Sequence, residues 1–228
     1  MSTVRLASNG VGGTIQGSFG TYVVGSDGTV TVDSRDAPPL IAAGMSYLAN
    51  RGDSYTTPIA PIAAASGQIV TSGGLTNGSV SVANQPDIMR QVSFVIGAGT
   101  VAVTAGTVTV VYVGSDQQSH TDVLSAACAA SGTTTQPLSR GVVSVTSVTV
   151  AGVVGGASPF IHGDTTALIA VPSDPGAQDF VLNNEIDDTG RQTAGTFSTS
   201  SLGCTTLHAA PNGTHTYSLA FAYVSPVI

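Results

Sequence analysis

Short segments rich in Val, Thr and Ile, separated by turn residues, fill the second half of the chain. Several of them alternate apolar and polar residues, which is the pattern of half-buried strands, and Gly, Pro, Asp and Asn gather between them. Strands are expected at 91–96, 107–113, 141–150, 167–171, 178–184, 194–198 and 215–224. Many short strands at this spacing are typical of a sandwich or a jelly roll. The sequence therefore predicts a mainly β fold in which residues 91–228 form one antiparallel β-sandwich or jelly-roll-like domain.

Two segments of this domain allow more than one interpretation. TDVLSAACAAS (121–131) is the only stretch of the domain that could form a helix, and its Val, Thr and Ser content leaves a strand open. The segment 215–224 alternates large apolar residues on one face, which predicts a core strand that closes the domain. An exposed carbohydrate-binding face is the alternative for these residues, which are Tyr217, Leu219, Phe221 and Tyr223.

Residues 1–50 carry different signals. Within 20–34, two strand candidates are joined by GSDG, a turn in which Asp27 helps to close a hairpin. The following DAPPLIAAG predicts a helix of barely two turns, with Asp36 as the N-cap, two prolines in the first turn and Gly44 after the last turn. We therefore predict a small N-terminal β-hairpin and short helix that form an anchoring module.

The short helix cannot be stable by itself, so its apolar side chains must pack against something. We predict that Leu40, Ile41 and Met45 dock onto a partner or onto the module's own sheet.

Residues 51–90 hold three prolines and paired glycines, with short strand candidates at 67–72 and 78–83. This composition indicates an extended arm. The arm is too apolar for a free linker, because Ile59, Ile62, Ile69 and Val70 would lie in water. We expect it to lie along a neighbouring subunit, and Ile59 and Ile62 complete the set of predicted docking residues.

Charged side chains are scarce. Asp, Glu, Lys and Arg make up 8% of the 228 residues, about a third of the usual share; there is no lysine, and the net charge is −7. With a mean hydropathy of +0.31, this composition indicates that other chains cover much of the surface. An obligate homo-oligomer is therefore expected.

The same composition argues against several classes of partner. The six arginines are spread singly, so direct nucleic-acid binding is not expected. The most apolar stretch, 141–160, is interrupted by Ser, Thr and Gly, which argues against membrane insertion. The N-terminus lacks the apolar core of a signal peptide, so a protein that is cytoplasmic or released by lysis is expected. Cys128 and Cys204 are expected to be reduced thiols, although spacing alone does not decide whether they pair.

Candidate reactive groups are few. His120 with Asp122, and His162 with Asp164, are two residues apart and would share one face of a strand. No serine lies in a G-x-S-x-G context, so we interpret both as hydrogen-bonded loop histidines and predict no catalytic residues.

Metal and cofactor binding are not expected either. Oxygen-rich segments occur at 173–179 and 183–188, and we interpret them as solvated turns that bind no metal. If a structural cation binds, Glu185, Asp187 and Asp188 are the first candidates. RGD (51–53) is interpreted as a chance match, and NGS (77–79) and NGT (212–214) as turns.

The stretch TYVVGSDGTVTVDSRDAPPLIAAGM (21–45) resembles a short unit that recurs in structural proteins of tailed bacteriophages. The segments 141–156, 165–188 and 210–223 also resemble phage virion proteins of the head or tail. The resemblance implies a non-enzymatic virion component that is assembled in the host cytoplasm. The leading expectation is a capsid decoration (cement) protein. It implies the major capsid protein and sister subunits as partners, with a trimer favoured. It carries over no active-site residues.

Two other functions are kept as alternatives. The first is a spike or fibre-associated protein of the head or tail that takes part in host adsorption. The second is a β-sandwich that binds or cleaves glycans. The copy number in the particle separates decoration from a tail role.

Overall fold

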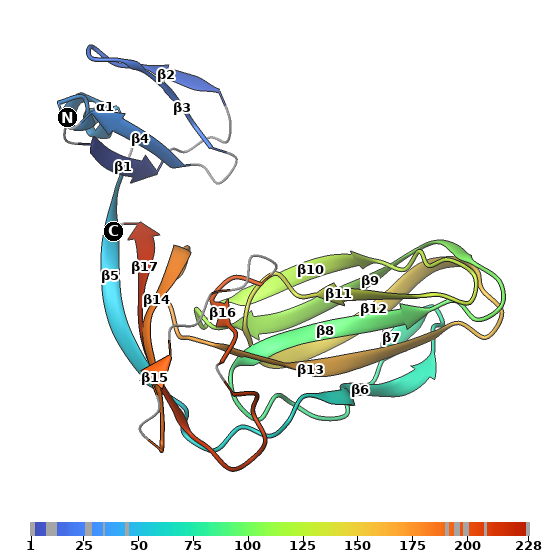
Figure 1. The fold of residues 1–228 in the computed structure, drawn as a ribbon. Coiled ribbons are helices and arrows are strands. Elements are labelled where there is room, and N and C mark those ends of the chain that lie inside the picture. Colours follow the sequence, from blue (N-terminus) through green and yellow to red (C-terminus); the bar gives the residue numbers. More distant parts are fainter. Residues whose placement is uncertain are drawn as a thin grey trace. The chain divides into compact units, whose positions relative to one another are not determined.

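The structure is a computed structural model, and it describes residues 3–7, 13–25, 29–33, 35–43, 46–189, 192–193, 197, 201–207 and 209–226 (Figure 1). Antiparallel strands dominate it, and one short helix is present among the described residues. The chain divides into two compact units. The smaller comprises Met1–Arg51, Gly176–Asp179 and Tyr223–Ile228, and the larger comprises Gly52–Pro175 and Phe180–Ala222.

Two four-stranded antiparallel layers can be traced in the larger unit. One has the order β6 (Ala65–Gly74), β13 (Phe160–Ala170), β8 (Arg90–Gly97) and β11 (Thr133–Pro137). The other has the order β7 (Gly78–Val80), β12 (Val142–Gly155), β9 (Val103–Gly114) and β10 (Ser119–Ser125). Val142 also pairs with Arg90, where the two layers meet.

The strand pairing defines a jelly roll. β6 pairs with β13, β7 with β12, β8 with β11 and β9 with β10. These eight strands therefore form one long antiparallel ribbon, in which β6 to β9 run against β10 to β13. The ribbon is rolled up so that successive strand pairs lie in alternate layers (Figure 1). The prediction of a mainly β, sandwich or jelly-roll-like fold is confirmed.

Apolar side chains that alternate along the strands form the core of the jelly roll. On β9, Val108, Val110 and Tyr112 are fully buried, while the alternating residues Thr109 and Val111 between them are not. Phe94 of β8 and Val148 of β12 belong to the same core cluster. The stretch 121–131, for which the sequence allows either a helix or a strand, forms part of β10 and the turn after it.

The predicted arm over 51–90 is corrected by this topology. Its two strand candidates are β6 and β7, and both belong to the jelly roll, which therefore begins well before residue 91. Ile69 and Val70 are buried in the core of the same unit. Their apolar character is thus explained by the chain's own fold, since the long strands β12 and β13 supply the partners.

Another sheet contains the order β15 (Gln192–Thr193), β14 (Gln178–Asp187), β17 (Tyr217–Pro226) and β5 (Ser46–Thr56). The apolar residues of β17 singled out from the sequence are all buried, at 5% exposure or less, so the core-strand prediction is confirmed and the carbohydrate-binding alternative for this face is wrong. The short β16 (Cys204–Thr205) pairs with β13. Most of the predicted strand 194–198 lies outside the described residues.

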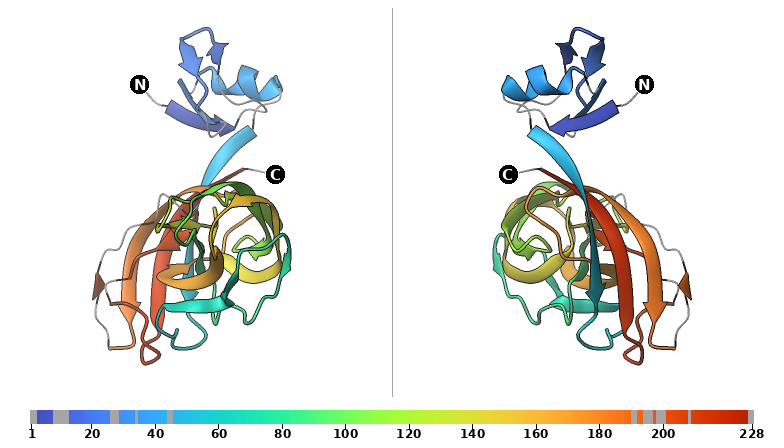
Figure 2. Two further views of the ribbon diagram at one scale, coloured as in Figure 1. Left: turned by 90° about the vertical axis from the view of Figure 1, so that its right-hand side faces the viewer. Right: turned by 90° about the vertical axis from the view of Figure 1, so that its left-hand side faces the viewer.

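The smaller unit contains β1 (Thr3–Ala7), β2 (Thr14–Gln16), β3 (Thr21–Val23), β4 (Thr29–Asp33) and α1 (Ala37–Ala42) (Figure 2). β1 pairs with β4 and with the start of β5, while β2 pairs with β3. The predicted hairpin is therefore wrong: its two strands exist as β3 and β4, but they belong to different sheets. A turn signal reverses the chain without specifying which strand each side pairs with, and the turn residues 26–28 lie outside the described residues.

Candidate functional site

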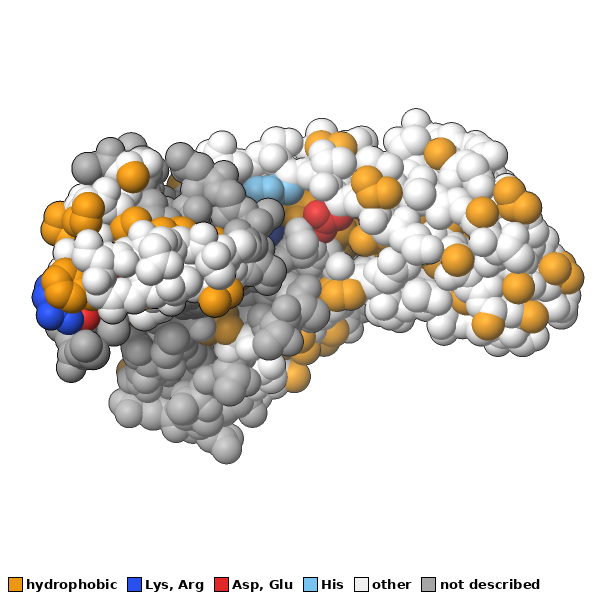
Figure 3. Space-filling model, turned by 90° about the horizontal axis from the view of Figure 1, so that it is seen from above, with side chains coloured by type: hydrophobic (Ala, Val, Ile, Leu, Met, Phe, Trp, Pro, Cys, Tyr) orange, Lys and Arg blue, Asp and Glu red, His pale blue; other side chains and the backbone are white. Residues whose placement is uncertain are grey.

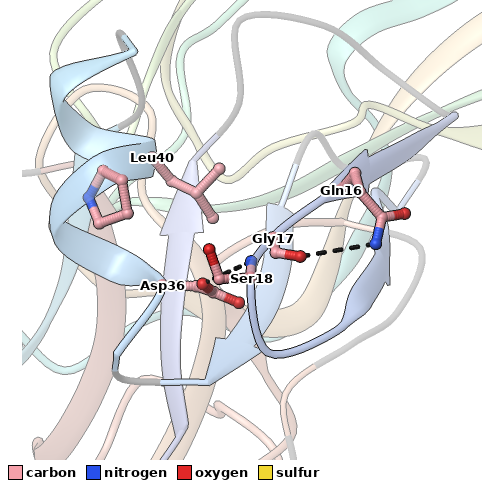
Figure 4. A pocket seen from close by; sticks show the side chains of 6 residues that line it. Gln16, Gly17, Ser18, Asp36 and Leu40 are labelled. Carbon is pink, nitrogen blue, oxygen red and sulfur yellow. Dashed lines mark hydrogen bonds between the residues drawn. The ribbon is translucent and has the colours of Figure 1, made fainter.

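Asp36 is the best-organised polar group of the smaller unit. It directly precedes α1 and is 1% exposed. Its Oδ1 accepts a hydrogen bond from the Ser18 backbone N–H at 2.9 Å (Figure 4). Its Oδ2 accepts from the Phe19 N–H at 3.0 Å and from the Tyr22 hydroxyl at 2.6 Å. We call Ser18, Phe19, Tyr22 and Asp36 the Asp36 clamp, because it ties the start of the helix to the β2–β3 turn.

The side-chain cap predicted for Asp36 is corrected by this geometry. An N-cap side chain accepts from the N–H groups of the second or third helical residue, and these positions are occupied by Pro38 and Pro39, which have no N–H. The backbone carbonyl of Asp36 still accepts from the Leu40 N–H at 3.2 Å, so the helix begins where expected. The prolines leave the carboxylate available for the β2–β3 turn.

Gly17 allows this close approach. A Cβ at this position would overlap Oδ2 of Asp36 and would lie 2.8 Å from Cε2 of Tyr22. Residue 17 must therefore be glycine, because a side chain there would keep the carboxylate from reaching the N–H groups of Ser18 and Phe19.

Electrostatics favour the ionised form of Asp36 and of Asp33. Burial acts to raise the pKa of Asp36, but the hydrogen bonds from Tyr22, Phe19 and Ser18 outweigh it and hold the pKa below its ordinary value. The hydrogen bond to Asp36 raises the pKa of Tyr22. Hydrogen bonds from Arg35, whose Nη2 lies 2.8 Å from Oδ2 of Asp33, hold the pKa of Asp33 far below its usual range.

We expect the smaller unit to lose stability in acid. A carboxyl whose pKa is lower in the folded than in the unfolded chain stabilises the fold above its unfolded pKa, about 4, and this contribution is lost as the pH falls through the folded pKa. The signals of the smaller unit in two-dimensional NMR spectra should therefore broaden or move to unfolded positions below about pH 4. The variant Asp36→Asn should show a weaker pH dependence, and an equal dependence in both proteins would contradict a role for this carboxylate.

A pocket of about 410 Å³ opens beside the clamp. It is lined by Gln16, Gly17, Ser18, Asp36, Pro39 and Leu40. Figure 4 shows Leu40 of α1 on one side of it and the turn after β2 on the other. The carboxylate already accepts three hydrogen bonds, and the Gln16 amide is bonded to Thr21 and Gly17. The pocket therefore offers a partner chiefly the apolar surface of Pro39 and Leu40.

The structure describes three of the five predicted docking residues in full. Leu40 is half-buried and packs against the core cluster of its own unit. The side chain of Ile41 and all of Met45 lie outside the described parts. Ile59 and Ile62 belong to the larger unit and are 49% and 39% exposed.

The backbone of Ile62 is held by two charged side chains of its own unit. Its N–H donates to Oδ2 of Asp87 at 2.8 Å, and its carbonyl accepts from Nη2 of Arg90 at 3.0 Å. Arg90 is fully buried, and its Nε lies 3.2 Å from Oδ1 of Asp87. The segment before β6 is thus fixed while the Ile62 side chain faces solvent.

Both candidate histidines are hydrogen-bonded as expected, but they lie on strands β10 and β13 and not in loops, and His120 does not pair with Asp122. His120 Nε2 lies 2.8 Å from Oδ1 of Asp116, a buried residue in the β9–β10 turn, because this turn folds back along β10 with Gln117 at φ +59°. Asp122 instead accepts from the N–H and the hydroxyl of Ser139, at 2.6 and 2.9 Å.

His162 and Asp164, which are two residues apart on β13, form a hydrogen bond with Nδ1 2.6 Å from Oδ1. Ser66 Oγ lies 3.2 Å from the same Nδ1. A Ser-His-Asp relay needs the serine and the carboxylate on opposite ring nitrogens. This group therefore has the composition of a triad without its geometry.

The remaining polar and thiol groups offer little further chemistry. Among the described residues, no group of three or more His, Cys, Asp and Glu is arranged to hold a metal. Asp187 accepts hydrogen bonds from the N–H and hydroxyl of Thr189, and Asp188 lies 2.8 Å from His215 Nδ1. Both cysteines are free and buried, and burial raises the pKa of Cys204 to about 12. In the part of the chain that the structure describes, no helix has the length and apolarity needed to cross a membrane.

Comparisons of the chain with models of protein families, with curated proteins and with solved structures find no match. The carboxylate of the clamp accepts three hydrogen bonds from its own unit, so its role is structural: it holds the β2–β3 turn against the start of α1, beside the pocket.

Proposed function

We propose that the protein is a non-enzymatic structural protein of a tailed-bacteriophage virion, most specifically a capsid decoration (cement) protein. The observation that carries the proposal is the jelly roll, a fold used by viral capsid proteins and built here from β6 to β13. The resemblance of residues 21–45 to a recurrent phage unit points the same way. In this proposal the smaller unit attaches the protein to the shell, and the jelly roll contributes contacts with sister subunits.

The scarcity of charged side chains supports a protein that binds other proteins of a shell through large contact surfaces. A cement protein holds a shell together through buried area and shape, and charges at such contacts must be desolvated at a cost. This chain has few charges to desolvate. In the smaller unit it exposes Phe19 and Val23, at 50% and 72%, and Leu40 of the same unit lines the pocket. Leu40, Ile41, Met45, Ile59 and Ile62 remain the proposed docking residues.

Host adsorption as a spike or fibre-associated protein is the second candidate. The observation that favours it is again the jelly roll, which lectins also use. The described part of the larger unit offers glycans little, because its exposed large hydrophobic side chains are aliphatic: Ile59, Ile62, Val101, Val123 and Val154. Glycan sites commonly stack sugars on aromatic rings, so we place decoration first.

Attachment can be tested with mature heads that lack the protein. The purified chain is mixed with such heads, and the bound fraction is measured by co-sedimentation. The wild type should bind saturably, and Val23→Asp should weaken binding at least about tenfold, since a charge would enter an apolar contact. Leu40→Asp should abolish binding.

Val123→Asp is the matched control, because Val123 is 64% exposed in the larger unit. It should bind as the wild type does. Val23→Asp keeps the attachment test informative if Leu40→Asp fails to fold. Unchanged binding of Val23→Asp, or no binding of the wild type, would contradict attachment through the smaller unit.

A further inference from the structure

One end of the jelly roll carries no charged side chain. It is formed by the four connections β6–β7, β8–β9, β10–β11 and β12–β13. With the adjoining strand ends these span 71–80, 97–107, 126–135 and 150–161, which contain no Asp, Glu, Lys or Arg. We call these residues the neutral end. It lies to the right in Figures 1 and 3, and the face drawn in Figure 3 shows hydrophobic and uncharged side chains there.

The opposite end of the jelly roll is built differently. Its connections, β7–β8, β9–β10 and β11–β12, hold Asp87, Asp116 and Arg140. Arg140 Nη1 lies 3.6 Å from Oδ2 of the buried Asp116. The charges of the roll are therefore polarised toward one end, and the neutral end is a distinct surface.

Two large apolar side chains are exposed at the neutral end. Val101 is 53% exposed in the β8–β9 connection, and Val154 is 56% exposed at the end of β12. Their segments are directly linked, because the Gly156 N–H donates to the Ala102 carbonyl at 3.0 Å. Exposed apolar side chains in an uncharged setting are typical of contact surfaces.

The neutral end is also preformed. Its connections are tied by backbone hydrogen bonds, from Ala157 N–H to the Ala98 carbonyl at 3.2 Å and from Leu75 N–H to the Pro159 carbonyl at 2.9 Å. Gly99 approaches so closely that a Cβ there would overlap the carbonyl oxygen of Ala157. A surface that is already ordered loses little conformational entropy on binding.

We propose that the neutral end is a contact surface between copies of this chain. Each copy carries a net charge of −7, so copies repel one another unless they meet where charge is absent. A charged partner would find no complementary charge here. A second neutral end matches this surface in charge and polarity, and symmetric contacts between identical patches are the common form of self-association. The inference deepens the sister-subunit contacts of the proposed function, whereas the proposed attachment through the smaller unit does not depend on it.

The test uses the full-length chain and the double variant Val101→Asp/Val154→Asp, studied by sedimentation velocity over a range of concentrations. The wild type should form an oligomer, and the double variant should dissociate at least about tenfold more readily, because it places acids in the contact. Both valines are exposed, so the thermal unfolding midpoint should stay unchanged.

Val123→Asp is the matched control, because Val123 is 64% exposed on β10, outside the neutral end and outside the proposed docking residues. It should associate as the wild type does. A monomeric wild type, an unaffected double variant, or equal dissociation of the control would overturn the inference. A monomeric wild type that still binds heads would overturn this inference alone and leave the proposed function standing.

Discussion

Replacing Gly17 with alanine is expected to disrupt the smaller unit while leaving the jelly roll folded. The added Cβ overlaps the Asp36 carboxylate, which cannot move aside without giving up its three hydrogen bonds. Overpacking of this kind costs about 1–3 kcal/mol, a large share of the stability of a unit of about sixty residues, which is about 3–9 kcal/mol. Hydrogen exchange followed by mass spectrometry should show faster exchange in 13–25 and 29–33.

Gly73→Ala provides the control for this experiment. Gly73 lies in β6, and a Cβ there would meet only the Thr71 carbonyl oxygen, at 3.8 Å. This variant should exchange like the wild type throughout. If Gly17→Ala leaves exchange in the smaller unit unchanged, the clamp does not hold that unit together.

Replacing Phe94 with alanine is expected to be the most damaging single change in the larger unit. Phe94 is fully buried between the layers of the jelly roll and lies opposite Gly163 in register, where its ring covers the glycine. Truncation of a buried phenylalanine costs about 3–5 kcal/mol. Urea unfolding followed by circular dichroism should show a loss of this size.

Phe94→Leu should lose less, because it leaves a smaller cavity. Val123→Ala, at a site 64% exposed, should change the unfolding free energy by less than about 0.5 kcal/mol. A loss below about 1 kcal/mol for Phe94→Ala would mean that the layers do not pack through this side chain.

The strands of the jelly roll could be predicted from the sequence because their periodicity is local. Val108, Val110 and Tyr112 alternate with threonines and valines along β9, and the structure buries the first set. The pairing could not be predicted in the same way. β6 and β13 are joined only by contacts between residues far apart in the chain, such as Ile161 with Gly73. Without that pairing, the Gly-rich β6 resembles an arm.

The donors of the Asp36 clamp could not be predicted from the sequence, although part of the signal is local. Asp36 before a short helix suggests a cap, yet the prolines at 38 and 39 remove the N–H groups that a cap would use. A carboxylate at such a position needs donors from elsewhere. Which donors it finds, at Ser18, Phe19 and Tyr22, depends on how β2 and β3 pack against α1, and no local pattern specifies that.

The location and copy number of the chain in purified virions test the proposed function most directly. Quantitative mass spectrometry of intact particles, and of separated heads and tails, gives both. A decoration protein is expected in the head fraction at on the order of hundreds of copies per particle, since it occupies symmetry-related sites of the shell. Its absence from the particle would contradict the account, and a count of about three to twelve copies in the tail fraction would support the adsorption alternative instead.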